Sequence, residues 1–81
     1  MVVSVHFFGQ QRTLTRTPEI KIPLFEESRV NDVLCYLKEN YPELKISQDD
    51  FLVSVNDRIS NSDQVLKAND IIAFIPHIGG G

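Results

Sequence analysis

The residues whose types and spacing best suit chemistry lie at the C-terminal end of the chain, which reads His77-Ile78-Gly79-Gly80-Gly81. Three successive glycines have no side chains to pack, so we expect this segment to be mobile and solvated. Fully extended, residues 77–81 reach about 17 Å at ~3.4 Å per residue, which is enough to enter a channel in another protein. A channel that fits only bare backbone excludes chain ends that carry a Cβ. This pattern is typical of a chain end that another protein handles as a substrate.

The reactive group at this end would be the α-carboxylate of Gly81. A free α-carboxyl group has a pKa of roughly 3.3–3.7, so it is ionised at neutral pH and is a poor electrophile. Reaction there requires prior activation, most simply as a mixed anhydride with AMP. The sequence shows no phosphate-binding loop and no nucleophile–base pair, so we expect a separate enzyme that uses ATP to perform the activation. The alternative is an inert, frayed end, and the glycines alone do not decide between the two.

The elements that position this end follow from the spacing of apolar residues. Alternation of apolar and polar residues predicts strands, and apolar residues at helical spacing predict a helix. The predicted strands cover Val2–Phe8, Glu19–Leu24, Phe51–Asn56, Arg58–Ser60 and Ile71–Pro76, and the predicted helix covers Val30–Tyr41. Pro18 and Pro23 place the second strand at a sheet edge, because proline cannot donate to a ladder. We expect Gly9–Thr17 to be a polar turn, and either Ser28 or Asn31 to cap the helix.

These elements form an α+β pattern, in which one helix must cover one face of a sheet. The first and last strands are strongly apolar, so we expect them to lie side by side at the centre. The pattern predicts a β-grasp (ubiquitin-like) roll, with a mixed sheet of about five strands and one main helix. The domain is expected to span residues 1–76, followed by a flexible tail at residues 77–81.

The composition argues against several other classes of protein. A chain of 81 residues with 42% hydrophobic and 23% charged residues is expected to fold as one globular domain. Its net charge is −3 and its eight lysines and arginines are scattered, which argues against a nucleic-acid partner. The single Cys35 excludes an internal disulfide, a cysteine-ligated zinc site and a Cys₄ iron–sulfur cluster, and therefore a β-grasp ferredoxin. We expect no metal site and no permanently bound cofactor.

Targeting signals are also not expected. No segment approaches the roughly 20 apolar residues that a membrane-spanning helix needs. Residues 1–8 lack the basic start of a signal peptide, and polar residues interrupt their apolar run. We therefore expect a cytoplasmic protein that does not associate with membranes.

Several motifs follow one another along the chain. They are Val5-His6-Phe7-Phe8-Gly9 followed by Arg12, Val30-Asn31-Asp32-Val33-Leu34, Tyr41-Pro42, Val53-Ser54-Val55-Asn56, Leu66 with Asn69-Asp70, and the run from Ile72 to Gly81. This ordered set resembles the MoaD/ThiS-like family of sulfur carriers, and within that family it is most similar to the small subunits of molybdopterin synthase. Two positions depart from the family pattern: His77 replaces a proline, and Asn69 replaces a turn glycine, which asparagine tolerates in the left-handed region.

The resemblance implies a function for the chain end. An adenylyltransferase of the ubiquitin-activating type (MoeB-like) would adenylate Gly81, and the adenylate would then be converted to a thiocarboxylate. Gly80 and Gly81 would form the functional pair, with Gly79, Ile78 and His77 also in contact with partners. The large subunit of molybdopterin synthase (MoaE-like), in a heterotetramer, would use this sulfur in molybdenum cofactor biosynthesis. The chain itself would be a sulfur-carrying subunit with no active site of its own.

Four residues of the domain are further candidates for partner contacts. Phe8 alternates onto the polar, outward face of the first strand, and Ile75 is its counterpart on the last strand. If these strands are neighbours, the two side chains form one exposed apolar patch, which Ile59 would extend. The alternative is that the sheet curls and buries them. Arg12 either pairs with an acidic group of a partner, which the family pattern favours, or anchors its own loop.

Other functions remain open at this point. The same tail would serve a sulfur carrier for thiamine synthesis or tRNA thiolation, although the chain length favours the molybdopterin carriers. It would equally serve a ubiquitin-like modifier that is conjugated to lysines through Gly81. A plain β-grasp interaction domain with an inert tail is the remaining alternative.

Overall fold

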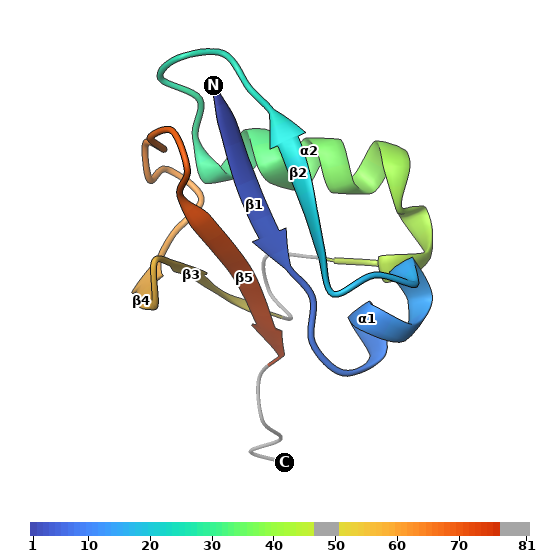
Figure 1. Ribbon diagram of the computed structural model, residues 1–81. Helices are drawn as coiled ribbons and strands as arrows, with labels where there is room; N and C mark the ends of the chain where they lie inside the picture. The colour runs from blue at the N-terminus through green and yellow to red at the C-terminus, as the bar shows by residue number, and fades with distance from the viewer. Residues whose placement is uncertain (47–50, 77–81) are drawn as a thin grey trace.

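Residues 1–46 and 51–76 are described by the computed structural model, and they form one five-stranded mixed sheet with a helix across one face (Figure 1). The helical elements are α1 (Gln10–Thr15), α2 (Val30–Asn40) and the 3₁₀ turn η1 (Pro42–Leu44). The strands are β1 (Val2–His6), β2 (Glu19–Pro23), β3 (Phe51–Val55), β4 (Arg58–Ser60) and β5 (Ile71–Pro76). Their order across the sheet is β2-β1-β5-β3-β4. This is the predicted α+β arrangement, and the β-grasp fold class is confirmed.

The central strands of the sheet include the first and the last strand of the chain, as predicted. β1 and β5 lie side by side and parallel, with Ser4 opposite Ile71 and His6 opposite Ala73. The other neighbouring strands are antiparallel. β2 lies at an edge, where Pro23 does not interrupt a second ladder. β5 is therefore held by β1 on one side and by β3 on the other before it ends at Pro76.

The core lies between α2 and the face of the sheet that this helix covers. Alternate residues of the two central strands point to this face, and Val3, Val5 and Ile72 are fully buried there. The predicted apolar stripe of α2 packs against them. Its buried residues are Val30, Val33, Leu34 and Leu37. The side chains between these strand positions point to the opposite face, which α2 leaves open (Figure 1).

The segment Gly9–Thr17 is not the simple polar turn that the sequence predicts, because it contains the short helix α1. Gly9 precedes the helix with φ +55°, and Arg16 ends it in the left-handed region with φ +60°. Within the helix, the Thr15 hydroxyl donates a hydrogen bond of 2.8 Å to the Gln11 carbonyl. A helix of six residues is too short to show an apolar stripe, and its only buried residue is the polar Gln11.

The start of α2 also differs from the prediction. The N-cap residue is Arg29, so neither Ser28 nor Asn31 caps the helix. The Asp32 carboxylate instead accepts a hydrogen bond of 2.8 Å from the Arg29 backbone N–H. This acidic side chain in the first turn also interacts favourably with the helix dipole. A carboxylate that reaches back to the N-cap backbone therefore takes the place of the predicted capping side chain.

Strand ends and turns agree with the sequence to within a few residues. β1 ends at His6 rather than Phe8, β2 at Pro23 rather than Leu24, and β3 at Val55 rather than Asn56. A turn at Asn56-Asp57 joins β3 to β4, and both residues have positive φ, +51° and +68°. Asn69 adopts φ +69°, as expected for an asparagine in a turn-glycine position. Over residues 1–46 and 51–76, no helix is long and apolar enough to cross a bilayer.

Candidate functional site

The predicted reactive end continues directly from a central strand of the sheet. β5 runs to Pro76, which lies opposite Phe51 of β3. His77, Ile78, Gly79, Gly80 and Gly81 lie outside the described residues. The structure therefore defines the base from which this segment starts, which is the carboxyl end of β5 (Figure 1).

The open face of the sheet lies next to this base. One row of side chains crosses all five strands there. In order from β2 to β4, the row consists of Glu19, His6, Ala73, Ser54 and Ile59. Its centre, formed by the small side chains of Ala73 and Ser54, is buried, and it is flanked by polar residues at the β2 edge and by an apolar residue at the β4 edge. Along this row, the open face is therefore polar at its β2 edge and apolar at its β4 edge.

Exposed apolar residues gather on the β3, β4 and β5 side of the open face. Leu52 and Ile75 lie opposite each other on β3 and β5, and they are 40% and 36% exposed. Ile59 on β4 is 63% exposed, and Ile71, at the start of β5, is 42% exposed. Phe8 follows β1, on the other side of β5, and is 54% exposed; that it lies beside Ile75 stays a prediction, because β1 pairs with β5 only as far as His6 and Ala73. We call Phe8, Leu52, Ile59, Ile71 and Ile75 the open-face patch. Apolar groups gathered in this way on a small domain are typical of a surface that another protein covers.

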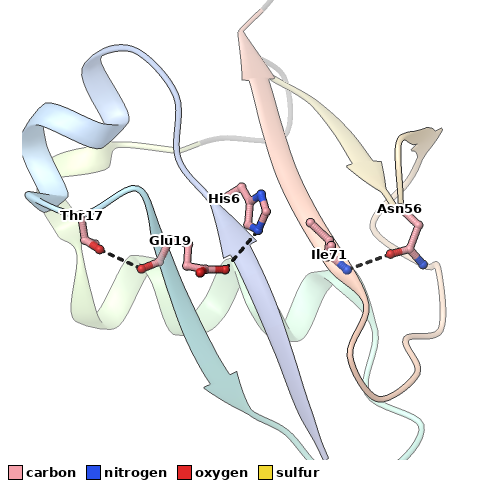
Figure 2. Close-up of polar contacts among 5 residues, drawn as sticks. All are labelled: His6, Thr17, Glu19, Asn56 and Ile71. Carbon is pink, nitrogen blue, oxygen red and sulfur yellow. Dashed lines mark hydrogen bonds and ion pairs between the residues drawn. The ribbon is translucent and has the colours of Figure 1, made fainter.

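The rim of the open face is polar at both ends. At the β2 side, His6 Nε2 lies 3.1 Å from the Glu19 carboxylate, and both side chains are exposed (Figure 2). The Thr17 hydroxyl donates a hydrogen bond of 2.9 Å to the Glu19 backbone carbonyl, which fixes the start of β2. Near the open-face patch, the Asn56 side-chain oxygen accepts a hydrogen bond of 2.9 Å from Ile71 N–H (Figure 2). An apolar centre with a polar rim is the usual organisation of a protein–protein interface.

The predicted partner-binding residues of the domain are all accessible in this structure. Phe8, Ile59 and Ile75 are exposed, so the sheet does not curl over them. Arg12 is exposed on α1, and its guanidinium has no hydrogen-bond or ion-pair partner within residues 1–46 and 51–76. Their contact with a partner stays a prediction.

Three residues of this region were missed from the sequence. Leu52 and Ile71 extend the open-face patch. Leu52 lies between the half-buried Phe51 and Val53, and Ile71 precedes the buried Ile72, so alternation along the strands is a signal that could have found them. Gln11 is buried beside β5, and nothing in its local sequence distinguishes it from Gln10.

In the part of the chain that the structure describes, no three His, Cys, Asp or Glu side chains gather as a metal site. Cys35 is a free, exposed thiol.

Comparisons with known proteins give one consistent family. The model of the ThiS family matches residues 5–81. The molybdopterin synthase sulfur carrier subunit of Mycobacterium tuberculosis is 30% identical over 80 residues, which cover 98% of this chain and 96% of that protein. Two solved structures with 26% identity share the fold. The small archaeal modifier protein 1 from Methanosarcina acetivorans has a TM-score of 0.83, with 99% of this chain and 96% of that chain covered. The other structure is a protein complex of subunits 1 and 2 of the molybdopterin-converting factor from Helicobacter pylori. It contains a chain with a TM-score of 0.71, and the match covers 100% of this chain and 100% of that chain.

The sheet order, the exposed face beside the end of β5 and the match over nearly the whole chain lead to the same conclusion. The chain belongs to the ThiS family.

Proposed function

We propose that this protein is the sulfur-carrying small subunit of a molybdopterin synthase. The observation that carries the proposal is that Gly79-Gly80-Gly81 continue from a central strand of the domain, in a chain matched over 98% of its length by a molybdopterin synthase sulfur carrier subunit. In this function the domain is the handle that partners recognise, and the C-terminal carboxylate is the group that reacts.

The proposed reaction starts from the ionised carboxylate of Gly81. On a ubiquitin-activating-type (MoeB-like) adenylyltransferase, a carboxylate oxygen attacks the α-phosphorus of ATP, which forms an acyl-adenylate and releases pyrophosphate. Hydrosulfide from a sulfur donor then attacks the acyl carbon, AMP leaves with the electron pair of the broken C–O bond, and loss of the S–H proton gives the thiocarboxylate. The small domain supplies no acid or base for these steps. Its glycines allow the backbone to lie in a narrow channel, because they have no Cβ to obstruct it.

The open-face patch is the proposed surface for the large (MoaE-like) subunit and the adenylyltransferase. Ile75 and its partner Leu52 offer apolar area directly before the end of β5, and Phe8, Ile59 and Ile71 offer further exposed apolar area. Arg12 offers an exposed positive charge beside this region, which suits an acidic group on a partner. The Helicobacter pylori complex, in which a protein of the same fold is bound to subunit 2, supports a large-subunit partner for this chain. These partners and ATP would place the protein in the cytoplasm.

Intact-mass measurement tests the reaction directly. The protein is incubated with the purified adenylyltransferase, ATP and a sulfur donor, and the expected product has one terminal oxygen replaced by sulfur. A variant with one alanine added after Gly81 is the matched control, because it keeps the domain and removes the terminal glycine carboxylate. Loading of the extended variant, or no change in the mass of the wild type, would contradict the proposal.

A second candidate function is supported by the similarity to the small archaeal modifier protein 1. In that function the same activated Gly81 would be transferred to a lysine of a target protein, and an isopeptide bond would form. Isopeptide-linked peptides that end in this glycine sequence, found by mass spectrometry of cell extracts, would support the modifier.

A carrier for thiamine or tRNA thiolation would be distinguished by deleting the gene. Loss of molybdoenzyme activity without a thiamine requirement is the result expected for the molybdopterin carrier.

A further inference from the structure

The side chain of Gln11 bridges the two central strands at the end from which the tail starts. Gln11 is only 5% exposed, and with Ser54 it is one of two buried polar residues among those described. Its Nε2 donates a buried hydrogen bond of 2.8 Å to the carbonyl of Phe74 on β5. Its Oε1 accepts a longer hydrogen bond of 3.5 Å from the backbone N–H of Phe8. One amide group therefore links the segment that leaves β1 to the last residues of β5.

These two hydrogen bonds lie where the ladder between β1 and β5 would otherwise continue. The Ser4 N–H donates to the Asp70 carbonyl at 2.9 Å, and each further rung of a parallel ladder advances both strands by two residues. Continued in this way, the ladder would bring the N–H of Phe8 to the carbonyl of Phe74. The paired residues end at His6 and Ala73 instead.

The Gln11 amide takes the place of that missing rung. A primary amide has the same donor and acceptor as a peptide group, so it satisfies both Phe8 N–H and the Phe74 carbonyl. Gln11 thus lets the chain leave β1 toward α1 without leaving a buried carbonyl of β5 unpaired.

We propose that Gln11 is a positioning residue for the reactive tail, because it helps to fix the end of β5, from which the tail continues in sequence. On the β3 side, the end of β5 is held by the pairing of Ile75 with Leu52 and of Pro76 with Phe51. On the β1 side, the Gln11 amide donates a hydrogen bond to the carbonyl of Phe74, one residue beyond Ala73, the last residue of β5 that pairs with β1. Removing the amide would leave this carbonyl, two residues before the end of β5, without its hydrogen bond to Gln11.

The effect of Gln11 on the reaction of the tail rests on the proposed function. Activation requires the Gly81 carboxylate to meet ATP at one place in the adenylyltransferase. Misplacement of a reacting group by about 1 Å lowers the rate by about 100-fold. A tail whose starting direction is no longer fixed should therefore reach the reactive position less often, even when the domain docks normally.

The first test uses the isolated protein and does not depend on sulfur transfer. The variant Gln11→Met has a side chain of similar length that neither donates nor accepts these hydrogen bonds. Gln10→Met is the matched control, because Gln10 is the neighbouring, exposed glutamine of the same helix. Backbone residual dipolar couplings should change at Phe74 and Ile75 in Q11M and stay unchanged in Q10M. Unchanged couplings at Phe74 and Ile75 in a folded Q11M would overturn the inference.

The second test measures adenylation by the purified adenylyltransferase with the small protein as the varied substrate. We expect Q11M to lower kcat by about 10- to 100-fold with little change in KM, and Q10M to match the wild type. An unchanged kcat, or an effect on KM alone, would overturn the positioning role. If Q11M does not fold, Gln11→Asn replaces it, because asparagine keeps the amide but is one methylene too short to reach both partners. If even the wild type forms no adenylate, the proposed function fails, while the dipolar couplings still decide whether Gln11 holds the end of β5.

Discussion

Truncation of Ile59 provides a quantitative test of the open-face patch. Complete burial of an isoleucine side chain contributes about 1.5–3 kcal/mol relative to full exposure. Ile59 is 63% exposed in the free protein, so about 1–2 kcal/mol remains to be gained when a partner covers it. At 1.4 kcal/mol for each factor of ten, Ile59→Ala should raise the Kd for the large synthase subunit by about 5- to 30-fold. Isothermal titration calorimetry with the purified large subunit measures this change.

Phe25→Ala is the control for this measurement. Phe25 is the most exposed of the large apolar residues that the structure describes, at 90%, but it follows β2 at the end of the sheet away from the end of β5. If general surface hydrophobicity drove binding, its loss would weaken the complex more than the loss of Ile59. We expect the Kd of Phe25→Ala to equal that of the wild type within error. An unchanged Kd for Ile59→Ala, or a larger effect of Phe25→Ala, would refute the assignment of the open-face patch as the interface.

Three further changes test the tail, the core and the helix cap. Deleting Gly81 should abolish thiocarboxylate formation in the intact-mass assay and leave the urea unfolding curve unchanged, whereas a shifted curve would mean that the terminal residue contributes to the fold. Leu37→Ala should lower the free energy of unfolding by about 2–5 kcal/mol, because Leu37 is 1% exposed in the core; a loss below 1 kcal/mol in urea titration would contradict that packing. Asp32→Ala removes the hydrogen bond to Arg29 N–H and should cost about 0.5–2 kcal/mol in the same titration, while Asp63→Ala, at an exposed position outside helices and strands, serves as its comparison.

The fold was predictable because its strongest signals are periodic. The alternation in β1 and β5 and the stripe in α2 each persist over several residues, so they specify which faces are buried. The central, side-by-side position of the chain's first and last strands followed from their apolar character. The turn at Asn56-Asp57 was also predictable, because these residue types tolerate positive φ.

The features that the sequence did not predict depend on single contacts between distant residues. Gln11 is buried because its amide meets Phe74, 63 positions further along the chain, and no local pattern encodes that meeting. α1 was missed for the same reason, since its one buried residue is polar. The cap of α2 was misassigned because the Asp32 carboxylate, three residues further along the chain, accepts the hydrogen bond from Arg29 N–H. Sequence patterns thus predict the layers of the fold better than they predict the contacts that fix the ends of its helices and strands.

The central position of β5 has a consequence for biosynthesis. A nascent chain that has not yet emerged through Ile71–Pro76 lacks the strand that joins β1 to β3, so the two halves of its sheet have no shared ladder. Most of the contacts of β5 are distant in sequence, and such contacts form late during folding. Prematurely terminated products would consequently remain incompletely folded and would be subject to proteolysis. Only molecules translated through this last strand can therefore complete the five-stranded sheet.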